Sequence, residues 1–108
     1  MRLIKTIVRE HKLEDVRRAL DQLSVGGLTV SHVIGAGRHK ASAMMYRGLE
    51  YVPLLPRRQV EVVVAENMVD DAVRAIMNAA RTGVVGDGMV YVSVVNDSYR
   101  IRTGDWEG

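Results

Sequence analysis

The stretch that decides the fold is residues 59–95, QVEVVVAENMVDDAVRAIMNAARTGVVGDGMVYVSVV. It opens with an aliphatic run from Gln59 to Ala65, whose β-branched composition is typical of a strand. Apolar residues then recur at helical spacing between Met68 and Thr82. After a glycine-rich turn at residues 86–88, the segment Met89 to Val95 is again rich in valine. The stretch therefore predicts one strand–helix–strand unit.

The first half of the chain repeats this order. Leu3 to Val8 has the composition of a strand, Lys12 to Leu23 has apolar residues at helical spacing, and Leu28 to Ile34 again favours a strand. Two such units predict an α+β, ferredoxin-like double βαβ fold: a four-stranded antiparallel sheet with both helices on one face. The length of 108 residues suits a single domain spanning residues 1–108.

The predicted sheet is apolar on both faces. In the third strand Val60, Val62 and Val64 point one way while Val63 points the other, and the fourth strand alternates in the same manner. Two helices cover only one face, so we expect identical subunits to cover the other. The alternative is that long side chains and the connecting loop cover it within one copy.

Composition narrows the function classes. The chain has no cysteine, which excludes disulfides, thiolate metal sites and cysteine nucleophiles. His11, His32 and His39 have no metal-ligand spacing, so no firm metal site is predicted, and no nucleophile stands beside a positioned base. A net charge of +2 does not indicate a nucleic-acid partner. No apolar run reaches the roughly 20 residues that a membrane span needs. We expect a cytoplasmic binding protein, with no membrane insertion, rather than an enzyme.

A long loop, about residues 36–56, joins the two units. A connection of about twenty residues is uncommon in a compact domain, and such loops are usually functional or disordered. Its middle, residues 44–51, is MMYRGLEY, and Met, Tyr and Arg are residue types that protein interfaces favour. We therefore expect this loop to contact a partner protein. A hairpin that packs on its own domain is the alternative.

Three segments suit an anion. Glycines in Gly86-Asp87-Gly88 let backbone N–H groups turn toward a phosphate, although an ordinary turn has the same pattern. Within a C-terminal tail of about residues 96–108, a short edge strand from Tyr99 to Arg102 would direct Arg100 and Arg102 to one side, as two phosphate-binding guanidinium groups or as a solvated edge. The segment Gly35 to Lys40 is glycine-rich and basic.

Taken together, these motifs resemble the PII family of nitrogen and energy sensors. The resemblance covers nearly the whole chain and rests on three stretches in order: Gly35 to Lys40, Tyr46 to Tyr51, and Thr82 to Gly88 followed by Arg100 to Gly104. It implies a homotrimer that binds ATP or ADP as effectors in clefts between subunits, with Mg²⁺ and 2-oxoglutarate accompanying ATP. Through the long loop, called the T-loop in that family, it would regulate target proteins of nitrogen metabolism, which are enzymes, transporters or regulators.

The resemblance also assigns residues by matching position. The implied nucleotide-binding residues are Ile7, Gly27, Leu28, Thr29, Gly35, Gly37, Arg38, Glu61, Val63, Gly86, Asp87, Gly88, Arg100 and Arg102. The implied 2-oxoglutarate residues are Arg9, His39, Lys40 and Arg57. Tyr51 matches a tyrosine that carries a nucleotidyl group in some relatives, and an exposed contact residue is the alternative.

Two departures from the family pattern bear on the ligand. Met89 stands where relatives have a lysine after the glycine-aspartate-glycine turn, so triphosphate should lose more affinity than diphosphate or monophosphate. His39 stands where relatives have a glutamine, and imidazole is a poor ligand for Mg²⁺. An alternative reading is a divergent paralogue that senses ADP, AMP or another small anion without 2-oxoglutarate. A trimeric scaffold or metal binder fits the sequence less well because of the arginine pair and the glycine-aspartate-glycine turn. An RNA-binding domain also fits less well, since Tyr91 is the one aromatic residue on the fourth strand and the chain has no Phe.

Overall fold

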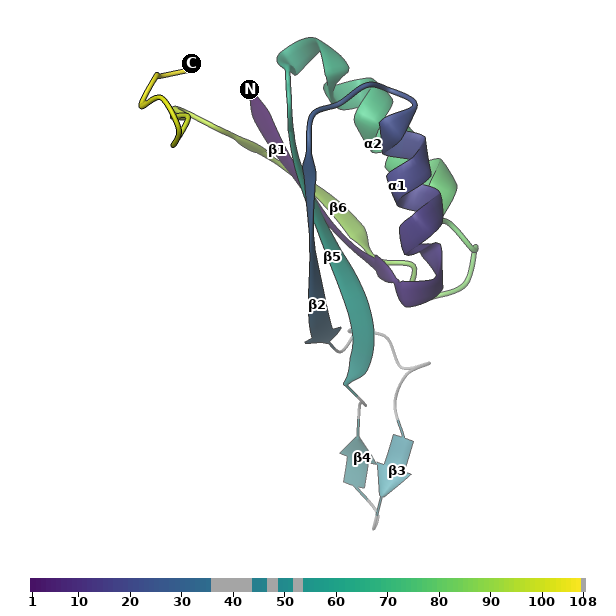
Figure 1. The fold of residues 1–108 in the computed structure, drawn as a ribbon. Helices are drawn as coiled ribbons and strands as arrows, with labels where there is room; N and C mark the ends of the chain where they lie inside the picture. The colour runs from purple at the N-terminus through teal and green to yellow at the C-terminus, as the bar shows by residue number, and fades with distance from the viewer. Residues whose placement is uncertain (36–43, 47–48, 52–53, 108) are drawn as a thin grey trace.

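Four strands form one antiparallel sheet in the order β2–β5–β1–β6 (Figure 1). The computed structural model describes residues 1–35, 44–46, 49–51 and 54–107. The strands are β1 (Arg2–Arg9), β2 (Leu28–Gly35), β5 (Leu55–Val64) and β6 (Met89–Val94). Every pairing in the sheet is antiparallel, with β1 and β5 in the middle and β2 and β6 at the edges.

Two helices cover one face of this sheet (Figure 1). Helix α1 (Leu13–Asp21) follows a short 3₁₀ turn, η1 (Glu10–Lys12), and α2 (Val69–Ala80) follows η3 (Glu66–Met68). Each helix buries the apolar side of its amphipathic pattern against the strands. The buried core consists of Ile4, Val8, Val16, Leu20, Val60, Val62, Val64, Ala72, Ile76 and Ala80. The predicted ferredoxin-like double βαβ fold is confirmed.

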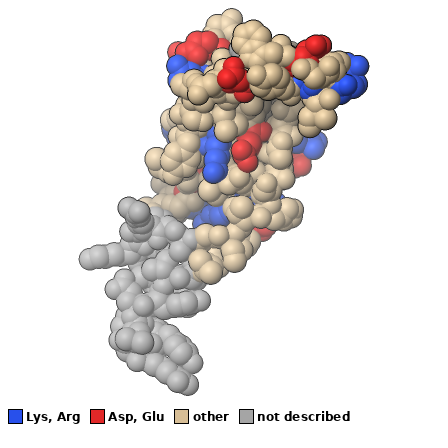
Figure 2. All heavy atoms as spheres, turned by 90° about the vertical axis from the view of Figure 1, so that its left-hand side faces the viewer, with Lys and Arg blue, Asp and Glu red and all other residues tan. Residues whose placement is uncertain are grey.

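The opposite face of the sheet carries no helix. By strand register, its side chains include Leu3, Ile7, Val63, Met89 and Tyr91, together with the facing pair Lys5 and Glu61. Met89, Tyr91 and Val63 are exposed. Figure 2, which views the molecule from this side, shows a surface that is mostly uncharged, with a few basic and acidic groups. We call it the open face.

A second, two-stranded sheet lies within the predicted long loop. Strand β3 (Met44–Tyr46) pairs antiparallel with β4 (Leu49–Tyr51). Figure 1 places this hairpin beyond one end of the four-stranded sheet, away from both helices. Strand β5 then begins at Leu55 rather than at the predicted Gln59, because Pro56 and the residues after it pair with the end of β2.

The predicted edge strand from Tyr99 to Arg102 is wrong. Tyr99 forms a single bridge with Trp106, and the chain between them turns back on itself. The backbone N–H of Gly104 donates to the carbonyl of Arg100, and the N–H of Arg100 donates to the carbonyl of Asp105. Gly104, with φ of +76°, supplies the left-handed conformation that this reversal needs. Arg100 and Arg102 therefore lie in and beside a turn and not on one side of a strand.

No helix within the described parts of the chain has the length and apolar character that crossing a membrane requires.

Candidate functional site

The loop between α2 and β6 is organised around one carboxylate, that of Asp87. Its Oδ2 accepts hydrogen bonds from the backbone N–H groups of Thr82 (2.8 Å) and Gly83 (2.9 Å), and its Oδ1 accepts one from the Thr82 hydroxyl. The hydroxyl bond, followed by the backbone bonds, holds the pKa of Asp87 well below its ordinary value. Asp87 therefore remains ionised and fixes the path of residues 82–88.

Arg9, at the end of β1, contacts the same loop at two points. Its Nε lies 3.2 Å from Oδ1 of Asp87, and its Nη2 donates to the carbonyl oxygen of Val85 at 2.8 Å. The side chains of Arg9 and Asp87 are only 21% and 24% exposed, so this ion pair is partly shielded from water. The contact joins the last residue of a central strand to a loop 76 to 78 positions later in the chain.

Two glycines let the loop pass close to β1. Gly88 has φ of +103°, and a Cβ at this position would lie 2.0 Å from the carbonyl oxygen of Ile7. Gly86 has φ of +105°, and a Cβ there would lie 2.9 Å from Nη2 of Arg9. Both sites favour glycine for conformation, and Gly88 also requires it for space, because its neighbour is a backbone atom. The structure thus places the predicted residues Ile7, Gly86, Asp87 and Gly88 together.

This turn has the character of an anion site. Among the described residues, no hydrogen bond leads from the backbone N–H groups of residues 85–88 to a protein acceptor. Arg9 and Arg57 are cross-strand partners, and Nη2 of Arg57 lies 3.8 Å from the position of a Cβ on Gly86. Arg57 makes no ion pair within the described chain, and its Nη1 donates to the carbonyl of Pro56. Counting the described residues, two cations and one carboxylate leave a local surplus of positive charge.

A second group of predicted residues lies farther along the open face. Gly27, Thr29, Glu61 and Val63 line a hollow of about 320 Å³, together with Leu3 and Val62. Thr29 and Glu61 are partners across β2 and β5, and Gln59 donates to Glu61 at 2.8 Å. Leu28 pairs with Val62 in the same register. An apolar hollow suits a planar ring, and the polar groups beside it suit the hydroxyl groups of an attached sugar.

The C-terminal arginines form a third group. Arg100 makes two contacts with the Glu107 carboxylate, at 2.7 and 3.0 Å, and these lower the pKa of Glu107. Trp106 donates its indole N–H to Asp97 at 2.9 Å, which closes the tail as a small hairpin. Arg102 is exposed and makes no ion pair with a described residue.

One copy of the chain does not bring these groups together. Gly88 adjoins Ile7, whereas Val63 pairs with Leu3, four residues back along β1 and about 13 Å away at strand spacing. The tail starts beyond the other end of β1, where Val95 bonds to Met1, about 20 Å from Ile7 by the same spacing. Gly37, Arg38, His39 and Lys40 lie outside the described residues, and Tyr51 ends β4.

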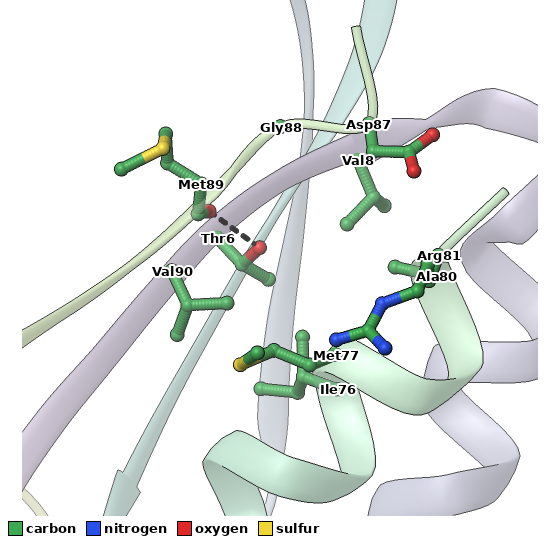
Figure 3. Close-up of a pocket in the computed structure, with 10 residues that line it drawn as sticks. All are labelled: Thr6, Val8, Ile76, Met77, Ala80, Arg81, Asp87, Gly88, Met89 and Val90. Carbon is green, nitrogen blue, oxygen red and sulfur yellow. Dashed lines mark hydrogen bonds between the residues drawn. The ribbon is translucent and has the colours of Figure 1, made fainter. Parts of the chain in front are cut away.

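A smaller pocket of about 140 Å³ lies behind the turn on the helix side of the sheet (Figure 3). Thr6, the one buried polar residue in the described part of the chain, donates from this side to the Met89 carbonyl at 2.8 Å and so fixes the start of β6. Figure 3 shows the side chains of Met89 and Asp87 pointing in opposite directions from the chain. Met89 thus presents a thioether, not a cation, to the open face.

Sequence reasoning missed the role of Arg9 in this loop, because it assigned Arg9 to an effector by resemblance. The contacts of Arg9 with the loop join residues more than 70 positions apart, and no local sequence pattern predicts them. The Thr82–Asp87 spacing is the one signal within the loop, since an Asp near a hydroxyl and free N–H groups often closes a turn.

A comparison with family profiles matches residues 1–105 to nitrogen regulatory protein P-II. The chain belongs to this family. The P-II protein of Rhizobium etli is 43% identical over 106 residues, covering 97% of this chain and 95% of that protein. GlnK of Escherichia coli K12 is 42% identical, and the P-II protein of Cereibacter sphaeroides 44% identical, each with the same coverage. The expected family is confirmed, and with it the expectation of a regulatory protein rather than an enzyme.

Proposed function

We propose that this P-II protein binds ATP or ADP in clefts between copies of itself and regulates target proteins of nitrogen metabolism through the loop of residues 36–56. The observation that carries the proposal is the division of the predicted nucleotide residues into separate groups on one face of the sheet. One group has the N–H groups of the Gly86 turn, which donate to no acceptor within the described chain, and the other has the hollow at Thr29 and Glu61. A nucleotide bound between two copies would contact one group on each copy.

The open face supports this assembly. A contact that joins one group on a copy to the other group on the next copy is heterologous, and such contacts close into rings when the rotation permits. The exposed apolar residues of the open face, Val63, Met89 and Tyr91 among them, would be covered at the centre of a ring. Three copies is the number that membership in the P-II family favours.

In this arrangement the phosphates lie at the Gly86 turn of one copy and meet Arg100 and Arg102 of the next. Backbone N–H groups in a glycine turn and guanidinium groups are suited to phosphate oxygens. Arg100 would exchange its contact with Glu107 for the phosphate. Because Met89 adds no charge here, the site should favour diphosphate more than a site with a further lysine would.

A nucleotide bound at the Gly86 turn would lie close to the base of the loop of residues 36–56. The loop leaves from the ends of β2 and β5, at Gly35 and Leu55, and Arg57 lies beside both the β5 end and the Gly86 turn. A ligand that engages Arg57 changes the charges at the base of the loop. Differential affinity for two loop arrangements would then alter docking on a target.

Isothermal titration with ATP, ADP and AMP, each with Mg²⁺ and then with 2-oxoglutarate, tests the proposal. We expect ADP and ATP to bind. The Arg100→Ala/Arg102→Ala variant should keep its fold and lose at least about tenfold in nucleotide affinity, equivalent to about 1.4 kcal/mol.

The matched control removes two exposed arginines from α1, as Arg17→Ala/Arg18→Ala, and should bind like the parent chain. Binding of AMP or ADP alone, with no response to 2-oxoglutarate, would instead support the divergent sensor. No heat from any nucleotide would overturn the proposal, and unchanged affinity in the double variant would remove the phosphate role of the tail.

A further inference from the structure

The two contacts that Arg9 makes with the loop use two of the five N–H donors of its guanidinium group. Nε faces Asp87 and Nη2 faces the Val85 carbonyl, so the planar fork holds a side chain and a main-chain oxygen of the same turn at once. Nη2 also lies against Gly86, where a Cβ would come within 2.9 Å. The guanidinium group therefore fits between β1 and the turn, where it contacts the protein.

We propose that Arg9 is a positioning residue of the nucleotide site, which holds the Gly86–Gly88 turn in its binding shape through Asp87 and the Val85 carbonyl. This inference rests on the proposed nucleotide function and deepens it. It gives Arg9 a role within the protein, whereas the family resemblance assigned it to an effector.

The charges around Arg9 and Arg57 support a positioning role for Arg9. The positive charge of Arg9 is matched by the ionised Asp87 at 3.2 Å, whereas Arg57, directly opposite on β5, has no carboxylate partner among the described residues. An incoming anion gains more from a cation that has no carboxylate partner in the described part of the chain. Recognition then falls to Arg57 and to the N–H groups of the turn, while Arg9 maintains the geometry in which those N–H groups face the ligand.

Lysine cannot perform this role. A lysine ammonium is a point charge on a flexible stem, and it does not present two donors in the fixed fork that spans Asp87 and Val85. A positioning role therefore predicts that Arg9→Lys behaves like Arg9→Gln, although it keeps the charge. A role in direct charge recognition predicts that Arg9→Lys behaves like the parent protein.

The first experiment uses the full chain without nucleotide. Amide resonances of Gly86 and Gly88 are followed by NMR in the parent protein, Arg9→Lys and Arg9→Gln. We expect both variants to shift or broaden these two resonances while the core amides stay in place. The matched control is Arg58→Gln, which removes an arginine of similar exposure (19%) that pairs with Glu10 at the same end of the sheet. It should leave both glycine resonances unchanged.

The second experiment measures ADP affinity by titration. Arg9→Lys and Arg9→Gln should each weaken binding by at least about fivefold, and Arg58→Gln by less than about twofold. If Arg9 acts through Asp87, the loss in the Arg9→Gln/Asp87→Asn double variant should be smaller than the sum of the two single losses, because both changes remove the same Arg9–Asp87 contact. Parental affinity in Arg9→Lys, or fully additive losses in the double variant, would overturn the inference.

The two proposals fail in different ways. A parent protein that gives no heat with ADP refutes nucleotide binding, whatever Arg9 does. Glycine resonances that stay fixed in both Arg9 variants refute the positioning role even when the parent protein binds ADP normally.

Discussion

Gly88 occupies the tightest position in the candidate site. Its neighbour is a backbone atom, the Ile7 carbonyl oxygen, which cannot rotate away as a side chain does. Since β1 is a central strand, a shift of Ile7 would disturb its pairings with both β5 and β6. The glycine is thus a requirement of the fold and not only of a ligand.

Gly88→Ala should destabilise the protein by about 2–6 kcal/mol, because left-handed strain and overpacking each cost about 1–3 kcal/mol. Chemical denaturation at neutral pH measures this loss. Gly83→Ala is the matched control, since Gly83 has φ of +83° but no atom within 4 Å of a Cβ. It should lose only about 1 kcal/mol, the conformational part. Equal losses in the two variants would show that contact with Ile7 is unimportant.

At the scale of elements, the loop 82–88 is held by an ionised carboxylate. In the folded protein the pKa of Asp87 is depressed, so the folded state resists protonation more than the unfolded chain does. The stabilisation is therefore complete above the ordinary pKa of about 4 and is lost as the pH falls below it toward the depressed value. Acid should loosen the link between α2 and β6.

The measurement compares the parent protein with Asp87→Asn, which cannot titrate at this position. The parent should be the more stable at pH 7, and the difference between the two should shrink as the pH falls from about 4. Glu66 and Glu107 also have lowered pKa values, but they titrate in both proteins and cancel in the difference. A difference that stays constant into acid would refute the role of the Asp87 charge.

Local patterns predicted the elements well where burial and periodicity agree. The alternating valines of β5 and the amphipathic face of α2 have only one arrangement that buries both, so the double βαβ fold was predicted correctly. The tail was predicted wrongly as a strand, because the reversal at Gly104 and the contact between Arg100 and Glu107 depend on a fold-back that alternation does not encode.

The candidate site was predictable only as a set of residue types. Family motifs identified Gly86, Gly88 and Glu61, and the structure places them on the turn and in the hollow. The family motifs could not predict that Arg9 contacts the loop, since that contact depends on the sheet bringing distant segments together. Their ligand contacts stay predictions.

At the scale of the whole molecule, the open face determines assembly in our proposal. Tyr91 is 53% exposed at the middle of β6. Tyr91→Asp should convert the assembly into single copies, because removing a carboxylate from water at an interface is costly even beside a cation. Lys5, its partner on β1, gives the new carboxylate a neighbour within one copy, so folding should be preserved.

Sedimentation velocity measures the result, with circular dichroism to check the fold. Asn78→Glu, a new charge on the exposed side of α2, is the control and should leave the assembly intact. A Tyr91→Asp protein that sediments like the parent would place the subunit contacts elsewhere.

Strand β6 has a further consequence for a newly made chain. Its sequence, Met89-Val90-Tyr91-Val92-Ser93-Val94, has no charge and no proline, and it is an edge of the sheet, where Met89, Val92 and Val94 are exposed. Such an edge is a template for amyloid-type pairing with other strands. A folded chain that has not yet assembled with other copies is therefore exposed to aggregation through this edge. Assembly and aggregation compete, and the concentration of the newly made chain determines which of them prevails.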